Sequence, residues 1–274
     1  MPEGPEIRRA ADKVANAIVG QPIREVFFGL PGLQRHARAL QRACVTEVQT
    51  FGKAMVTHFD NGRSVYSHNQ LYGKWYTVRP DADPKTNRQL RFAVRTEHRD
   101  ALLYSASTIE VLRREEVPDH PFISRLGPDP LHANVDVNTF SKRLRDPAFS
   151  GRQVGTLLLE QSFAAGIGNY LRSEILFFAG IHPCCKPREL DGRARRRLAH
   201  RLVTITRRAY ETGGVTDEPR RARRNKKAGQ RRGQFRHAVF RRIRQPCRDC
   251  GTTIVEGDFS SRRLFWCPRC QPAR

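Results

Sequence analysis

The sequence lacks three features that would each assign it to a broad class. It has no run of about 18 apolar residues, the minimum for a helix that spans a bilayer. It has no basic-then-apolar leader followed by a small-residue cleavage site. No internal repeat is evident, which argues against a repeat architecture. We therefore expect neither membrane insertion nor secretion, and we predict a cytoplasmic protein.

Acidic residues are scarce. The 274 residues include 27 Asp and Glu against 50 Lys and Arg, which gives a formal net charge of +23. Nucleic acid is the polyanion best able to offset such an imbalance, and an anionic membrane surface is the competing partner. A chain of this length is long enough for two domains and a small appendage.

One segment has no acidic residue at all. Between Pro219 and Arg244 it carries twelve Lys or Arg. Because like charges repel in such a run, we predict a mobile loop, or one that nucleic acid orders, with its most basic part at 220–232. The alternative is a solvated basic linker with no specific role.

Cysteine spacing points to a metal. Four of the seven cysteines form two CxxC pairs separated by sixteen residues: Cys247, Cys250, Cys267 and Cys270. This spacing predicts one structural Zn²⁺, since four thiolates leave no position for a catalytic water. A redox pair or disulfides are the alternative. Cys44, Cys184 and Cys185 are expected to pack rather than react.

Hydrophobic periodicity changes along the chain. Residues 6–20 have helical spacing, with Pro2 just ahead of them, and β-rich runs then extend to residue 115: IREVFF, CVTEVQ, MVTHF, KWYTV, LRFAVR and ALLYSA. After an aperiodic stretch rich in Pro, Gly and Asp, helical patterning recurs at 137–146, 154–166, 169–180 and 190–212. We predict an α+β multidomain fold with a β-sandwich or barrel, a mainly helical domain and a zinc hairpin.

The stretch GIGNYLRSEILF has two glycines and Asn169 at the start of a helix. Free backbone N–H groups at a helix start bind anions, so we expect these amides and the Asn169 side chain to face outward toward a phosphate. On the residues alone, a structural turn is at least as probable a reading.

Together, MPEGPEIRRA, FGKAMVTHF, SHNQLYGKW, GIGNYLRSEIL and SSRRLFWCPRC resemble the formamidopyrimidine-DNA glycosylase and endonuclease VIII family. These motifs extend from residue 2 to residue 270 in the family's order. Gly4 and the QLYG stretch are more similar to the endonuclease VIII branch. The resemblance implies an N-terminal helix plus β-sandwich, a helix-two-turns-helix domain and a zinc finger. The expected divisions are 1–118 for the catalytic domain, 119–134 for a linker, 135–218 for the helical domain, 219–244 for the basic loop and lead-in, and 245–274 for the zinc finger.

The resemblance also implies a mechanism. After removal of the initiator Met, the Pro2 amine would attack the sugar C1′, displace the damaged base and form an iminium. Glu3 would protonate the sugar ring oxygen, and β,δ-elimination would cut the strand on both sides of the lesion. Lys53 would contact a phosphate, although a Lys in a β-turn is usually a solvated charge.

Further residues are implied to contact DNA. Asn169 and Arg262 match a phosphate clamp, with Arg263 as a substitute if the hairpin register differs by one residue. Glu6 and Glu174 are given supporting roles only. Gln70, Leu71 and Tyr72 match the segment inserted into the duplex when the nucleotide is everted. The alternative for this segment is an ordinary strand edge with a buried Leu and Tyr.

The sequence thus predicts a monomeric, nucleoid-associated DNA glycosylase and abasic-site lyase that acts on oxidised pyrimidines in double-stranded DNA. A non-catalytic zinc-ribbon binder or lesion sensor on the same scaffold is the alternative. The basic stretch before the zinc finger departs from the family pattern and puts the lesion preference in doubt.

Overall fold

The computed structural model describes residues 2–273, which form two compact units. One comprises Pro2 with Glu6–Arg125, and the other Glu3–Pro5 with residues 126–273. Helix α1 (Gly4–Ile18) matches the helix expected from the sequence and starts two residues earlier. No helix among the described residues is both long and apolar enough to cross a bilayer.

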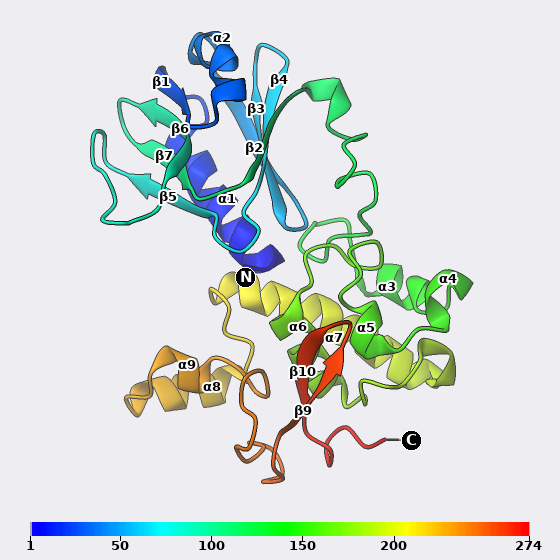
Figure 1. Ribbon diagram of the computed structural model, residues 1–274. Helices are drawn as coiled ribbons and strands as arrows, with labels where there is room; N and C mark the ends of the chain where they lie inside the picture. Colours follow the sequence, from blue (N-terminus) through cyan, green and yellow to red (C-terminus); the bar gives the residue numbers. More distant parts are fainter. Residues whose placement is uncertain (1, 274) are drawn as a thin grey trace. The chain divides into compact units, whose positions relative to one another are not determined.

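The first unit is a β-sandwich (Figure 1). Its strands are β1 (Ile23–Phe28), β2 (Val45–Phe51), β3 (Ala54–Phe59), β4 (Arg63–His68), β5 (Lys74–Val78), β6 (Leu90–Thr96), β7 (Asp100–Tyr104) and β8 (Thr108–Arg113). They form two antiparallel sheets with the orders β1-β6-β7-β5 and β2-β3-β4-β8. The six runs named from the sequence are all strands, and the predicted sandwich is confirmed.

The core of this unit lies between the sheets. Met55 and Phe59 from one sheet pack with Phe28 and Phe92 from the other, and α1 contributes Val14 to the same cluster. The remaining elements of the unit are short: η1 (Pro31–His36), α2 (Ala37–Gln41) and η2 (Arg114–Glu116).

The second unit is built around α6 (Asn169–Ala179), of whose eleven residues nine are buried. Around it lie α3 (Val137–Arg143), α4 (Pro147–Ser150), α5 (Val154–Leu157), η3 (Pro187–Glu189) and α7 (Gly192–Glu211). The helix expected over 154–166 is wrong beyond Leu157. Beyond Leu157 the chain forms turns instead of a helix. The side-chain amide of Gln161 donates hydrogen bonds to the carbonyls of Leu159 and Ile167.

The basic segment also differs from the expectation of a loop. It forms α8 (Pro219–Lys227) and α9 (Arg232–Phe235). Pro219 occupies the first turn of α8, and the Glu218 carboxylate accepts from the backbone N–H groups of Arg220 and Arg221, which caps the helix. The capping residue Glu218 lies just before the acid-free segment and stabilises the first turn of a helix there. The charge of the segment alone does not predict this helix.

The chain ends in a hairpin of β9 (Val255–Phe259) and β10 (Arg262–Trp266). Leu264 joins the core of the helical domain, whereas Phe265 packs with Cys247, Cys267 and Phe177. The two faces of one short strand therefore attach the hairpin to α6 and to its own cysteine cluster.

Candidate functional site

Glu3 lies against the start of α6. One carboxylate oxygen accepts from the backbone N–H groups of Gly168 and Leu171 at 2.9 and 3.2 Å, and the other from Tyr170 at 2.8 Å. The residue is only 4% exposed. Unpaired N–H groups and the helix dipole stabilise a carboxylate at this position. The anion at this helix start is therefore the protein's own Glu3, and the expectation that these amides face outward toward a phosphate is wrong.

Glycines permit this close approach. A Cβ on Gly168 would overlap the Glu3 carboxyl group. The Gly4 amide donates to the Gly166 carbonyl at 2.8 Å, and a Cβ on Gly4 would lie 3.0 Å from the Gly166 Cα. The motifs PEGPEI and GIGN, about 160 residues apart, are thus two halves of one contact.

Pro2 and Lys53 belong to the first unit. Pro2 is half-buried. Lys53 follows Gly52 (φ 58°) in the turn between β2 and β3 and is only 9% exposed. Lysine is rarely buried to this extent, so it is not the solvated surface charge that its place in a turn suggests. Burial, with the Lys53 ammonium as a second cause, lowers the pKa of His68.

Gln70 is fixed in a turn that follows β4. Its φ is 46°, and its backbone N–H donates to Nδ1 of His68 at 3.1 Å. At the side-chain amide, Nε2 donates to Thr108 at 2.8 Å and Oε1 accepts from Ser107 at 2.7 Å. A lowered pKa keeps His68 neutral and so able to accept the backbone bond. His68, Ser107 and Thr108 were not identified from the sequence.

This turn presents two apolar side chains to solvent. Leu71 is 58% exposed and Tyr72 is 68% exposed. The turn is tight, because the Gly73 N–H donates to the Asn69 carbonyl at 2.7 Å and a Cβ on Gly73 would lie 2.6 Å from the Asn69 Cα. The alternative reading, a strand edge with a buried Leu and Tyr, is therefore wrong.

Asn169 and the zinc hairpin meet in the second unit. Nδ2 of Asn169 donates to the Arg263 carbonyl at 2.8 Å. The hairpin turn, Ser260–Ser261, has positive φ at both residues, as in the two-residue turns that match strand twist. Nη1 of Arg263 lies 3.4 Å from a Glu256 carboxylate oxygen, whereas the exposed Arg262 forms no ion pair within the described residues. Of these two arginines, Arg262 is therefore the one whose charge is not offset by an acid among the described residues.

Arg172 fixes the hairpin to the helical domain. It is fully buried and donates to the carbonyls of Gly155, Phe259 and Arg262 at 2.6, 3.2 and 2.7 Å. Burial lowers its pKa to about 10, so it remains charged at neutral pH. One buried cation thus attaches both hairpin strands to α6, one turn beyond Asn169.

The four expected zinc ligands cluster. All four Sγ atoms lie within 4.8 Å of one another, and the Cys247–Cys270 and Cys250–Cys267 pairs are 3.9 and 3.4 Å apart. Tetrahedral coordination at about 2.3 Å requires sulfurs about 3.8 Å apart, so the cluster fits Zn²⁺. It holds one structural zinc, and none of the described cysteines is in a disulfide.

We expect Cys250→Ser to lower bound zinc in the presence of a chelator and to reduce the thermal unfolding temperature, because ligand loss removes binding free energy that stabilises the folded hairpin. Zinc content and differential scanning calorimetry measure this. Cys184→Ser is the matched control, since Cys184 is exposed and outside the cluster. Equal zinc content and unfolding temperature in the two variants would contradict the assignment.

Glu174 anchors the segment that precedes the zinc finger. Fully buried, it accepts from the backbone N–H groups of Ala238, Val239 and Phe240 at 2.8, 2.8 and 2.9 Å and from the Thr216 hydroxyl at 2.7 Å. Next to it, Nδ1 of His237 lies 2.8 Å from the same hydroxyl. From the sequence, Glu174 is given only a supporting role. In the structure, its carboxylate fixes the path of the chain into the zinc finger.

His237 predicts an acid-sensitive stability. Burial, followed by nearby arginines, lowers its pKa well below 6.5, so the folded protein holds it neutral. The unfolded chain protonates it near pH 6.5, so its effect is a loss of stability as pH falls below that value, by up to about 1.4 kcal/mol per pH unit. Unfolding free energies at pH 7.5, 6.5 and 5.5, measured with urea, should show a shallower decline in His237→Gln. His200→Gln is the control, and parallel declines in the wild type and His237→Gln would contradict the prediction.

The fold and site define a zinc-finger DNA glycosylase. The Formamidopyrimidine-DNA glycosylase N-terminal domain matches residues 1–107, the Formamidopyrimidine-DNA glycosylase H2TH domain matches residues 126–219, and the zinc finger found in FPG and IleRS matches residues 244–273. Endonuclease 8 of Shigella sonnei is 46% identical over 271 residues, covering 99% of this chain and 100% of the relative. The Escherichia coli enzyme is similar at 45% over the same coverage.

The chain belongs to the formamidopyrimidine-DNA glycosylase and endonuclease VIII family. It is a DNA glycosylase and abasic-site lyase of base excision repair. Solved structures agree on the fold. Lactococcus lactis Fpg in complex with DNA containing an oxidised pyrimidine has a TM-score of 0.81 at 21% identity, and the same enzyme with abasic-site DNA has a TM-score of 0.80 at 21% identity. Both cover 99% of this chain and 100% of the other.

Proposed function

We propose that this enzyme removes oxidised pyrimidines from double-stranded DNA through a Pro2 iminium and then cuts the strand by β,δ-elimination. The observation that carries the proposal is the carboxylate of Glu3, held by three backbone N–H groups directly after Pro2 in the chain. A solvated chain end on the surface would not require three backbone N–H groups to bind one carboxylate. With DNA as its substrate, the proposed enzyme works in the cytoplasm at the nucleoid.

The nucleophile in this proposal is the secondary amine of Pro2, exposed by removal of the initiator Met. Its lone pair attacks C1′, the base leaves with the bonding electrons, and the proton that remains on the Pro2 nitrogen passes to the departing base. When the bond from C1′ to the sugar ring oxygen then breaks, the nitrogen lone pair forms a double bond to C1′. The resulting iminium has no N–H to lose, so it persists as an electron sink. It acidifies the C2′ proton, whose loss expels the 3′ phosphate, and a second elimination expels the 5′ phosphate.

Glu3 is the proton carrier. Three backbone donors favour its ionised form, so it must take up a proton before it can give one. The Pro2 ammonium has to lose a proton before it attacks, and we assign that proton to Glu3. Donation of the same proton to the sugar ring oxygen then opens the ring, which returns Glu3 to the carboxylate state.

Three side chains hold the DNA backbone in this proposal: Lys53, Asn169 and Arg262. The buried position of Lys53 supports its role, as does the fact that Arg262 pairs with no acid among residues 2–273. Leu71 and Tyr72 enter the duplex in place of the everted nucleotide, and Gln70 supports them. The relatives named Endonuclease 8, and an Fpg complex with an oxidised pyrimidine, guide the choice of lesion.

Trapping with borohydride tests the chemistry. On a duplex with thymine glycol and on an abasic duplex, the Met-processed protein should give a covalent adduct that peptide mapping places at Pro2. Glu3→Gln should lower trapping on thymine glycol by about 10²-fold or more and lower it less on the abasic duplex, whose open aldehyde needs no ring-opening acid.

The control is Asp12→Asn, the same chemical change at an α1 carboxylate that pairs with Arg8 at 3.0 Å. An adduct on the abasic duplex alone would overturn the lesion class. Absence of any adduct, with zinc and DNA binding intact, would favour the non-catalytic binder.

Leu71→Ala combined with Tyr72→Ala tests the insertion. Eversion costs a few kcal/mol, so loss of the side chains that fill the gap should slow single-turnover excision from duplex DNA by about 10- to 100-fold. Cleavage of an abasic site in a single strand, where there is no stack to fill, should change little. The control is Ile243→Ala, which truncates another exposed apolar side chain. Equal slowing on both substrates would contradict insertion.

A further inference from the structure

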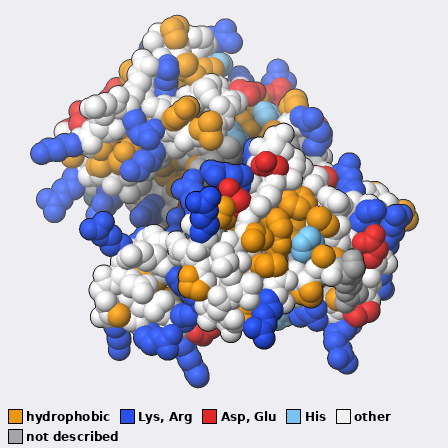
Figure 2. Space-filling model, turned by 60° about the horizontal axis from the view of Figure 1, so that its bottom comes forward, with side chains coloured by type: hydrophobic (Ala, Val, Ile, Leu, Met, Phe, Trp, Pro, Cys, Tyr) orange, Lys and Arg blue, Asp and Glu red, His pale blue; other side chains and the backbone are white. Residues whose placement is uncertain are grey.

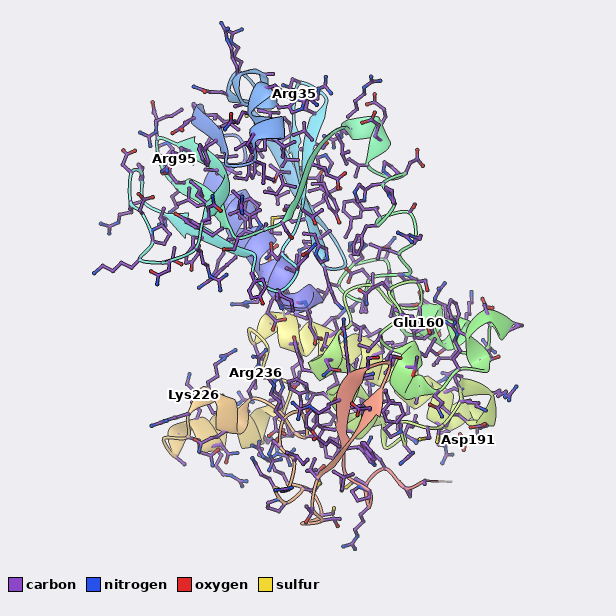
Figure 3. The ribbon with its side chains drawn as sticks, viewed as in Figure 1. Arg35, Arg95, Glu160, Asp191, Lys226 and Arg236 are labelled. Carbon is purple, nitrogen blue, oxygen red and sulfur yellow. The ribbon has the colours of Figure 1, made fainter. Side chains whose placement is uncertain are left out.

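The platform, defined here as α8, α9 and the residues joining them, exposes a dense set of positive charges. Seven exposed side chains carry them: Arg220, Arg223, Arg224, Lys226, Lys227, Arg231 and Arg232. Within the part of the chain that the structure describes, none of the seven forms an ion pair. Figure 3 labels Lys226 on α8, and Figure 2 shows how many more Lys and Arg than Asp and Glu occupy one face of the molecule.

A buried carboxylate attaches the start of α8 to the zinc finger. Asp217 is fully buried and pairs with Arg221 at 2.6 Å and with Arg248. Arg221 also pairs at 2.5 Å with Asp249, which lies between two zinc ligands, Cys247 and Cys250. Of the six basic residues in α8, only Arg221 is neutralised by these acids.

The far end of the platform is attached too. The Arg232 guanidinium donates to the Gly213 carbonyl, and Arg248 donates to the Gln234 carbonyl. Ala222 of α8 and Phe235 of α9 are buried. The exposed cations are therefore presented from a backbone fixed at both ends.

The arrangement of like charges indicates what the platform binds. Arg220 and Arg224, and Arg223 and Lys227, are four residues apart on one helix, where like charges repel. The acidic side chains of Asp217, Glu218 and Asp249, next to the start of α8, are directed to Arg221, to Arg248 or to the helix cap. A row of phosphates is the anion that offsets several such charges at once.

The platform and the residues assigned to the phosphate clamp lie in the same unit. From α9 the chain continues to Arg236, whose guanidinium carbon lies 5.1 Å from the ring centre of Tyr170, next to Asn169 (Figure 3). Two residues later the chain is bound by Glu174 of the same helix. A short, anchored segment thus connects the platform to α6.

We propose that the platform is a second DNA-binding surface, which contacts duplex backbone phosphates outside those held by Asn169 and Arg262. This inference rests on the proposed function, since it takes damaged duplex DNA as the substrate. It assigns the platform a share of affinity and salt dependence but no share in the chemical step.

The test compares two full-length variants with equal loss of charge. The platform variant carries Arg220→Gln, Arg223→Gln, Arg224→Gln, Lys226→Gln and Lys227→Gln, and leaves Arg221 in place. The control carries Arg38→Gln, Arg42→Gln, Arg63→Gln, Arg193→Gln and Arg196→Gln, all exposed and outside the platform. Affinity for an undamaged duplex of about 30 base pairs is measured between about 50 and 200 mM salt, where each phosphate contact contributes about 0.9 to the logarithmic slope.

The platform variant should bind at least 10-fold more weakly than the control at the lowest salt, with a slope smaller by about 3. Its single-turnover cleavage at saturating enzyme should equal that of the wild type. Equal affinities and slopes in the two variants would overturn the inference, because they would reduce the effect to net charge. Absence of lesion cleavage in the wild type would instead contradict the proposed function and leave the slope comparison valid.

Discussion

The contact between the Glu3 carboxylate and the first turn of α6 is the constraint on which the site depends. It requires a helix with free N–H groups and glycines on both sides of the contact, at Gly4 and at Gly168. It fixes the residue that follows Pro2 to the helix that also carries Asn169. An unpaired carboxylate buried to this degree would be strongly destabilising, so the N-terminal segment and the turn before α6 must be specified together.

Three further buried charges extend from that helix and its neighbours, and each organises a different segment. Arg172 binds carbonyls of the zinc hairpin, Glu174 binds amides of the lead-in, and Asp217 binds the arginines of α8 and of the zinc knuckle. Burying a charge costs several kcal/mol unless its hydrogen bonds are made. Because the partners of Arg172 and Glu174 are mostly backbone groups, these two charges fix the paths of loops, whereas Asp217 pairs mainly with arginine side chains.

The features that could be predicted from the sequence are those with a local sequence signal. The sandwich, α1, α6, α7 and the cysteine cluster carry local periodicity or spacing, and these predictions are confirmed. Strands β4 and β8 pair with each other over about 45 residues, so their partner is not a local signal. The same is true of Ser107 and Thr108, which hold Gln70 from a distant turn. The helix start was correctly placed, but its anion was not, because Glu3 is 165 residues away from Gly168.

The positions of the few acidic residues help to explain why the surface is so basic. In the second unit, four buried acids accept hydrogen bonds or form ion pairs that hold backbone segments: Glu3, Asp129, Glu174 and Asp217. They are therefore withdrawn from the surface, where they would compete with phosphate for arginine and lysine. The net charge of +23 is set by composition, and the internal position of these acids leaves cations such as those of α8 without compensation at the surface. In the proposed function, an enzyme that holds an everted strand benefits from this division, because the charges that shape the protein are separate from those proposed to meet the DNA.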